Sequence, residues 1–162
     1  MPPTRDAHDG PVEEGAPGSG PSWGHLPHGR LTNAIIGAMF EVYNVLGRGF
    51  LESVYANALT VELRQRGVPV DRNVSFEMMY RGASVGRYVA DLVVDQTVIV
   101  ETKVAKTIEP VHRAQLLNYL RASGLEVGLV ANFGSSMQFK RVVWTRRADQ
   151  HRGEERSGNG KA

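Results

Sequence analysis

The sequence predicts an α/β fold in which helices cover a mixed β-sheet, and three observations support this prediction. Residues 32–46 and 50–66 repeat apolar side chains at three- and four-residue spacing, which is the period of one helix face. From residue 74 onward, shorter stretches rich in β-branched side chains are typical of strands. A third helical stretch after Pro110 interrupts these strands. The expected order is therefore α-α-β-β-β-α-β-β, an α/β sandwich around a mixed sheet.

The first two helices are expected to form a hairpin. Thr32 or Asn33 can cap the start of the first helix, and Gly47 can end it. The second helix is expected to begin at about Phe50 and to stop at Gly67. A short loop with two glycines joins them. The apolar stripe of the first helix consists of Ile35, Ile36, Met39, Val42, Tyr43 and Leu46.

The remaining elements are strands with one helix among them. The expected strands cover residues 74–80, 85–94, 98–104, 127–132 and 141–144. Arg81 and Gly82 form the expected turn between the first two strands. The helix after Pro110 ends at Gly124 and buries leucines against the sheet. Those leucines are Leu116, Leu117 and Leu120.

The chain divides into one folded domain and two polar ends. Residues 1–29 contain six Gly and six Pro without a helical or strand period, so we expect a disordered leader. Residues 148–162, rich in Gly and charged residues, are expected to form a disordered tail. Residues 30–147 form the expected domain, in which 15 Lys and Arg stand against 10 Asp and Glu. Its resulting charge of +5 allows a polyanionic partner without requiring one.

Composition excludes several classes of protein. The 162 residues contain no cysteine, which rules out disulfides, thiolate catalysis and cysteine-bound zinc or iron–sulfur clusters. No apolar run is long enough to cross a membrane, and the start of the chain lacks the basic and apolar regions of a signal peptide. We therefore expect a soluble, cytoplasmic protein in which oxygen or imidazole would bind any metal.

Two acidic residues and a lysine are expected to meet on adjacent strands. Side chains alternate along a strand, so Glu101 and Lys103 point to one face. If residues 95–97 form a three-residue turn, the preceding strand places Asp91 directly opposite Glu101, with Cβ atoms about 5 Å apart. Apolar residues flank both positions, so two unpaired carboxylates there would repel one another at a high desolvation cost.

A divalent cation would offset that repulsion. Asp91 and Glu101, together with the backbone carbonyl of Thr102, form an oxygen-only ligand set suited to Mg²⁺ or Mn²⁺. Such an ion supports phosphodiester hydrolysis, and Lys103 can orient the attacking water or stabilise developing negative charge. The alternative is a structural ion pair between one carboxylate and Lys103, and the residues alone leave both interpretations open.

These residues resemble a known signature. Asp91, followed by Glu101-Thr102-Lys103 on the next strand, is similar to the PD-(D/E)xK nuclease motif, in which Asp and Glu bind metal and Lys assists the attacking water. Upstream, the stretch from Gly49 to Tyr55 resembles the name-giving motif of the small bacterial GxxExxY proteins. The likeness to this family spans most of residues 31–144, including residues 111–120 and 128–134. It implies a restriction-endonuclease-like sandwich, in which helices flank a mixed central sheet.

The resemblance also implies roles for three helical residues. Glu52, in the first turn of the second helix, would be an auxiliary acid near the metal, although a helix N-terminus favours an acid in any case. Gln115 and Tyr119, four residues apart on one helix face, match the Gln-x-x-x-Tyr motif of RecB-type nucleases, where it contacts substrate. Without the resemblance, both would be interpreted as ordinary surface residues.

The sequence thus predicts a Mg²⁺- or Mn²⁺-dependent nuclease that hydrolyses phosphodiester bonds of nucleic acid, with DNA favoured over RNA. Its expected catalytic residues are Asp91, Glu101, Lys103 and Glu52, and its expected substrate contacts are Gln115 and Tyr119. The alternative is a non-hydrolytic module of the same fold that binds nucleic acid or a protein partner. No membrane association is expected, and the residues leave open whether a homodimer or a protein partner completes the molecule.

Overall fold

A computed structural model describes residues 26–145 of the chain. The expected leader over residues 1–29 and the expected tail over residues 148–162 lie almost wholly outside this range, so their disorder stays a prediction. Within the described range, no helix combines the length and the apolar character that crossing a bilayer requires.

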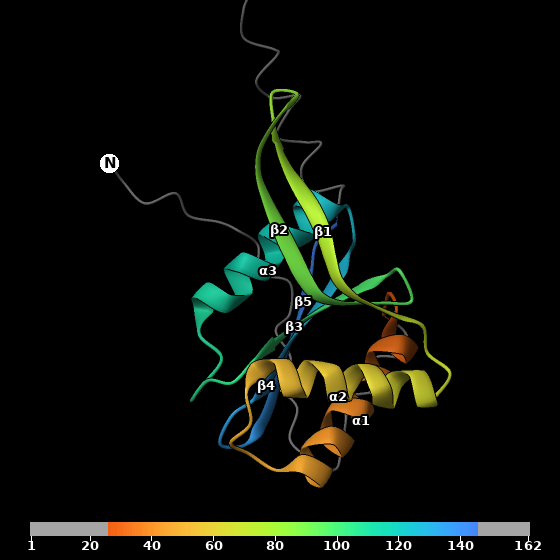
Figure 1. The fold of residues 1–162 in the computed structure, drawn as a ribbon. Coiled ribbons are helices and arrows are strands. Elements are labelled where there is room, and N and C mark those ends of the chain that lie inside the picture. Colours follow the sequence, from red (N-terminus) through yellow and green to blue (C-terminus); the bar gives the residue numbers. More distant parts are fainter. Residues whose placement is uncertain (1–25, 146–162) are drawn as a thin grey trace, which may run out of the picture.

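Between residues 26 and 145, three helices and five strands follow one another in the predicted order (Figure 1). The helices are α1 (Gly29–Leu46), α2 (Glu52–Gln65) and α3 (Pro110–Ser123). The strands are β1 (Val70–Tyr80), β2 (Ala83–Val94), β3 (Val98–Lys103), β4 (Val127–Phe133) and β5 (Met137–Val143). The predicted α/β class and element order are therefore confirmed.

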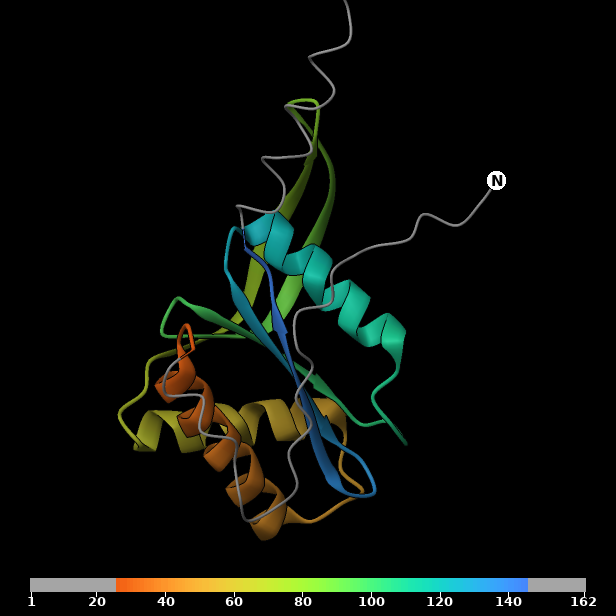
Figure 2. The same ribbon diagram turned by 180° about the vertical axis from the view of Figure 1, so that it is seen from behind.

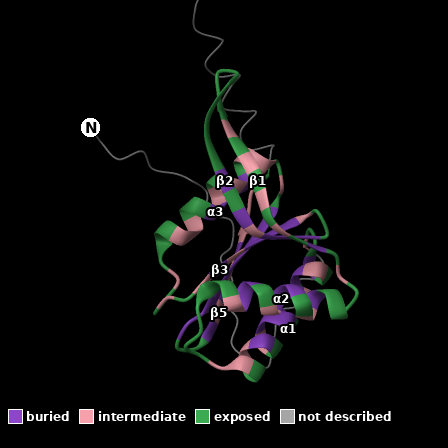
Figure 3. Cartoon of the chain, in the orientation of Figure 1, coloured by how far each residue is buried: buried purple, intermediate pink, exposed green. Residues whose placement is uncertain are grey.

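The strands form one mixed sheet in the order β1-β2-β3-β4-β5. Neighbouring strands are antiparallel except β3 and β4, which run parallel and are connected through α3. α1 and α2 cover one face of the sheet and α3 lies on the other, as two opposite views show (Figures 1 and 2). Each face has its own apolar core, and β4 is buried along its whole length (Figure 3). Burial on both faces is typical of a strand in a parallel pair.

The start of α1 differs from the prediction. The helix begins at Gly29, and the Thr32 hydroxyl donates to the His28 carbonyl at 2.9 Å instead of capping the helix. Thr32 therefore lies inside the first turns, where a hydroxyl can bond to the carbonyl four residues earlier. The predicted end is confirmed, because Gly47 follows the last turn with φ 70°.

Three strands start earlier than predicted, β2 by two residues, at Ala83, and two others by four residues each. β1 begins at Val70 and β5 at Met137, rather than at residues 74 and 141. In β5, buried and half-buried side chains alternate, which is the pattern of a strand with one face toward a core. Polar residues within both segments interrupt the runs of β-branched side chains on which the sequence prediction relied.

The hairpin of β1 and β2 changes face partway along its length. Alternate residues of a strand normally stay on one side. In β1, however, Val70 packs in the core under α1 and α2, whereas Val74 and Phe76 pack in the core under α3. The change occurs at Asn73, whose φ of 52° is in the left-handed region that Asn tolerates better than most residues. The pairing on either side places Asn73 opposite Asp91, so Asp91 lies at the joint of the hairpin.

Arg72 fixes this joint to the rest of the fold. Its guanidinium donates to the backbone carbonyl of Asp91 and, at 3.1 Å, to the side-chain carbonyl of Asn57 on α2. One side chain of β1 thus ties β2 to α2. The backbone of Asp91 is held in place by this contact even where the regular pairing of β1 with β2 is interrupted.

Candidate active site

The β2–β3 hairpin has the predicted register. Val94 pairs with Val98 across a three-residue turn, whose first two residues adopt the left-handed conformation of tight hairpins. The same register places Asp91 beside Glu101, as predicted. The length of the turn decides this outcome, because a slip of one residue would move every side chain of the strand to the other face.

Beyond the last backbone pair of β2 and β3, hydrogen bonds that involve side chains join the two strands. The amide and the hydroxyl of Thr102 both donate to Oδ2 of Asp91, each at 2.8 Å. In return, the Asp91 amide donates to Oε1 of Glu101 at 3.4 Å. Each carboxylate is therefore held by the opposite strand, and the two lie side by side.

Lys103 and Glu52 also lie near the pair of carboxylates, and they come from two further elements. Lys103 is the last residue of β3, and Glu52 is the first residue of α2. Glu52 is close enough to Lys103 and Asp91 for their charges to act on its pKa. The end of β3 and the beginning of α2 therefore converge on the carboxylate pair.

The predicted pair on α3 completes the cluster. Tyr119 is half-buried, and the negative charges of Glu101 and Asp91 act on its hydroxyl. The Gln115 side chain, one helical turn away, lies close enough to this hydroxyl to lower its pKa. Burial raises the pKa of Tyr119 most, with a further increase from Glu101. The structure thus brings all six predicted side chains together from α2, β2, β3 and α3.

The electrostatics of this cluster raise the pKa values of two of its acids, Glu101 and Glu52. Burial raises the pKa of Glu101 to about 8, and the negative charge of Asp91 adds to the increase. The Asp91 amide and the Lys103 ammonium oppose the shift without cancelling it. Burial also raises the pKa of Glu52, with Lys103 opposing and Asp91 adding to the shift. Acids with raised pKa values in close proximity are a mark of functional sites.

Lys103 is not held in a structural ion pair among residues 26–145. It makes no direct ion pair with any carboxylate of residues 26–145, although its charge acts on Glu52 and Glu101 from a longer distance. The alternative in which Lys103 simply neutralises one buried acid is therefore not supported. Lys103 as a whole is half-buried, and its ammonium group remains available to a ligand.

The oxygen atoms around Asp91 suit a cation that keeps water ligands. Amide and carbonyl of one residue point to the same edge of an extended strand. Because the Thr102 amide binds Asp91, the Thr102 carbonyl is directed to the edge of β3 that faces β2. No three His, Asp or Glu side chains within the described part of the chain form a ready-made ion cage. Two carboxylates and one carbonyl would therefore bind an ion only partly, as proteins commonly bind Mg²⁺.

Sequence reasoning missed Tyr88, which lies in the same cluster. Its ring stacks on Tyr119 with centroids 3.5 Å apart and on Phe76 with centroids 5.3 Å apart. Tyr88 is only 9% exposed, and its hydroxyl has no hydrogen-bond partner among residues 26–145. Burial and the charge of Glu101 raise its pKa. The change of face at Asp91 turns Tyr88 toward α3, and alternation along the strand gave no signal of that change.

His112 is a second neighbour that the sequence did not single out. Its Nδ1 accepts the backbone amide of Glu109 at 3.1 Å, as part of the cap of α3. Its charge nevertheless acts on Glu52. The cap occupies Nδ1, so Nε2 is the atom through which His112 can act on the site.

Comparison with known proteins places the chain in a family. Residues 29–142 match a family model described as the PD-(D/E)XK nuclease superfamily. The match spans more than half of the chain, so the protein belongs to this superfamily, and the predicted resemblance at that level is confirmed. The narrower likeness to the GxxExxY proteins stays a prediction.

Among solved structures, the chain is similar to the crystal structure of SSO0001, with a TM-score of 0.43 and 16% sequence identity. The similarity covers 79% of this chain and 65% of that one, so this chain spans less than two thirds of the similar protein. The comparison with curated proteins gave no match.

Proposed function

We propose that this protein is a metal-dependent nuclease that hydrolyses phosphodiester bonds of nucleic acid, with DNA favoured over RNA. The pairing of Asp91 with Glu101 carries the proposal, because two adjacent ionised carboxylates at the end of a buried hairpin are costly and a bound cation would offset that cost. The lysine beside them, Lys103, has no direct ion pair within residues 26–145. Membership of a nuclease superfamily supports the same function.

Asp91, Glu101 and the carbonyl of Thr102 would hold Mg²⁺ or Mn²⁺, which prefer oxygen ligands. The bound ion would supply an acidified water and neutralise charge on the phosphoryl oxygens. Glu101 must lose its proton to become a ligand, and its pKa of about 8 therefore couples ion binding to pH.

Lys103 and Glu52 would handle charge and protons at the scissile bond. The ammonium of Lys103 can donate to the attacking water or to a non-bridging phosphoryl oxygen, where negative charge develops. Glu52 lies within electrostatic reach of Lys103, and burial raises its pKa above the ordinary value, which is the direction that suits a general acid. We assign Lys103 the positioning of water and Glu52 an auxiliary role.

The aromatic side of the cluster would contact the nucleic acid. Gln115 and Tyr119 lie on α3 beside the carboxylates, so their amide and hydroxyl can bind the sugar-phosphate backbone. The hydroxyl of Tyr88, buried without a partner among residues 26–145, adds a donor at the base of the site. Backbone contacts of this kind position a strand without reading its sequence.

A cleavage assay tests the proposal. The purified protein is incubated with linear, circular and single-stranded DNA and with RNA, in the presence of Mg²⁺, Mn²⁺ or a chelator. We expect cleavage that requires the metal and that disappears in Lys103→Ala, while circular dichroism shows an intact fold. Lys140→Ala, the same chemical change on β5, is the control. Equal cleavage by Lys103→Ala and the control would refute the mechanism.

One observation favours the rival, a non-hydrolytic module that binds nucleic acid or a protein partner. Oδ2 of Asp91 already accepts two hydrogen bonds from Thr102, so the carboxylate has a structural role whether or not metal binds. Titration calorimetry separates the two functions. The absence of any heat of binding with Mg²⁺ and Mn²⁺, together with unchanged nucleic-acid affinity in Asp91→Asn, would favour the rival. A homodimer, a protein partner and a cytoplasmic location stay predictions.

A further inference from the structure

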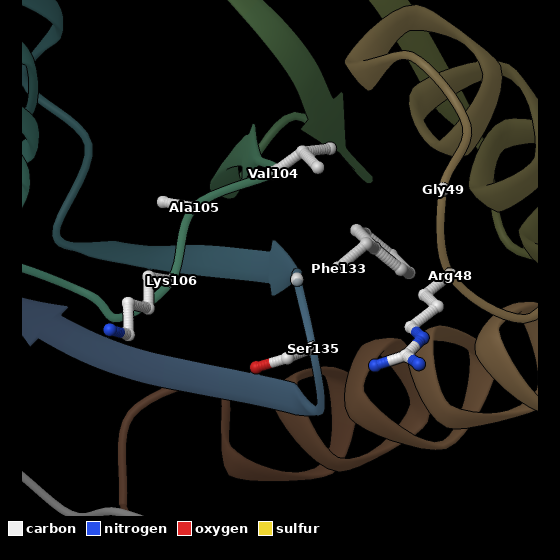
Figure 4. A pocket seen from close by; sticks show the side chains of 8 residues that line it. Arg48, Gly49, Val104, Ala105, Lys106, Phe133 and Ser135 are labelled. Carbon is white, nitrogen blue, oxygen red and sulfur yellow. The ribbon is translucent and has the colours of Figure 1, made fainter.

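A cavity of about 530 Å³ opens at the ends of the two parallel strands (Figure 4). Three segments line it, namely the loop between α1 and α2, the chain that leaves β3, and the turn between β4 and β5. Its volume is in the range of sites for small organic ligands. None of the proposed metal ligands lines this cavity, so it is a second feature of the surface.

Hydrogen bonds fix two walls of the cavity. The buried Asn132 side chain accepts from the Ala105 amide at 2.8 Å and donates to the Ala105 carbonyl at 2.9 Å. The Tyr43 hydroxyl donates to the Gly134 carbonyl at 2.8 Å. A Cβ on Gly134 would lie 2.0 Å from the Ala105 carbonyl oxygen, so the two walls touch as closely as glycine permits. The cavity is therefore preformed, which lowers the ordering cost of binding.

The cavity and the carboxylate cluster share two walls. Val104 lines the cavity and directly follows Lys103, and consecutive residues of an extended chain point to opposite faces. Gly49 lines the cavity as well and precedes Glu52 by three residues. Two separate segments thus contribute one residue to the cavity and another to the cluster. The cavity and the carboxylate cluster therefore lie on opposite sides of the end of β3, and a flexible strand bound at the carboxylates would reach the cavity by passing around that end.

The chemistry of the lining combines apolar surface with positive charge. Val104, which is 41% exposed, provides the accessible apolar surface, and Phe133 lies beneath it, 0% exposed and stacked on Tyr55. Arg48 and Lys106 are exposed at opposite sides of the cavity (Figure 4). None of the described residues that line it is acidic. Arginine and lysine bind phosphate, whereas apolar and aromatic surfaces take up bases of any sequence.

We propose that this cavity binds one nucleotide unit of the substrate strand, next to the phosphodiester positioned at Asp91 and Glu101. The base and sugar occupy the apolar surface, and Arg48 and Lys106 bind the flanking phosphates. The identity of the strand as substrate rests on the proposed nuclease function. Binding itself involves neither the metal nor Lys103.

Fluorescence anisotropy with a labelled oligothymidine of about 12 nucleotides tests the proposal in a chelating buffer, where the proposed cleavage stops. Arg48→Ala/Lys106→Ala should raise the Kd by about tenfold or more. The slope of log K against log salt should become shallower by about 1.4, since each lost phosphate contact on a single strand accounts for about 0.7. Arg81→Ala/Arg87→Ala, which removes the same charge from the β1–β2 hairpin, is the matched control and should change both values less.

The outcomes separate this proposal from the nuclease function. Equal losses in the two double variants would overturn the cavity proposal, because net charge would then explain them. Unchanged affinity in the Arg48/Lys106 variant, or no binding by the wild-type protein, would overturn it too, whatever cleavage shows. Binding that depends on the cavity without any metal-dependent cleavage would refute only the nuclease function. If the mononucleotide dTMP competes as well per site as the oligonucleotide, the cavity serves a free nucleotide and the proposal fails.

Discussion

Glu101→Gln removes the proton-binding group at the centre of the carboxylate cluster. In the folded protein without metal, burial and the charge of Asp91 raise the pKa of Glu101 to about 8, whereas its ordinary value is 4.5. Between these two values, the folded protein binds more protons than the unfolded chain. The free energy of unfolding therefore falls as pH rises through this window. The variant has no group to titrate there and should lose this part of the pH dependence.

The size of the effect follows from the shift. Each pKa unit corresponds to about 1.4 kcal/mol, and titration of Glu101 between about pH 5 and pH 8 accounts for about 3 kcal/mol of lost stability. This is an upper value, because Glu101 is coupled to neighbouring charged groups. Glu101→Gln should match the wild-type protein near pH 5 and exceed its stability near pH 8, with the gap widening steadily between them.

Urea unfolding at a series of pH values, in a chelating buffer, measures this gap. Glu126→Gln, which changes an exposed acid between α3 and β4, is the matched control and should follow the wild-type profile. Parallel profiles for wild type and Glu101→Gln would show that burial does not raise this pKa, and the reasoning would fail. With excess Mg²⁺, the wild-type protein should regain stability near pH 8, because an ion that binds only the folded state stabilises it. Glu101→Gln should regain much less.

Three further predictions concern the same region. Tyr88→Phe should leave the free energy of unfolding unchanged or raise it by about 1 kcal/mol, because it removes a buried hydroxyl without a partner among residues 26–145, yet it should slow cleavage. Urea unfolding and turnover of the same preparation check this, and unchanged turnover would leave the hydroxyl without a role. Gly134→Ala should lower stability by about 1–3 kcal/mol through the clash with the Ala105 carbonyl, measured as a fall in Tm, and an unchanged Tm would contradict the packing. The affinity for Mg²⁺ should rise about tenfold per pH unit below the Glu101 pKa of about 8 and then level off. Calorimetry in two buffers would count the released proton. An affinity for Mg²⁺ that does not change with pH would show that Glu101 does not lose a proton to bind the ion.

The sequence was sufficient to predict the pairing of Asp91 with Glu101, and the reason is local. A three-residue turn and strict side-chain alternation fix that register without knowledge of the rest of the fold. The helical residues Glu52, Gln115 and Tyr119 reach the cluster through tertiary packing, which no local pattern encodes. Only the resemblance to known nucleases indicated them, and the structure places all three at the cluster.

Other features escaped prediction because they depend on backbone conformation at single residues. The left-handed conformation of Asn73 reverses the faces of β1, and the outer half of the hairpin packs on α3 as a result. That reversal turns Tyr88 toward the site, where simple alternation from Val93 would place an even-numbered residue on the opposite face. The prediction of Thr32 or Asn33 as the cap is wrong, because the helix begins three residues before Thr32, at Gly29.

The joint at Asn73 and Asp91 divides the β1–β2 hairpin into two parts that pack on opposite faces of the sheet. The inner part is tied to α2 and β3 by Arg72 and Thr102, whereas residues 79–87 are exposed and project beyond the sheet (Figure 1). Lengthening, trimming or replacing that projecting tip would move atoms only on the far side of the joint. Evolution or a protein engineer can therefore vary the reach of this arm while the two carboxylates keep their positions.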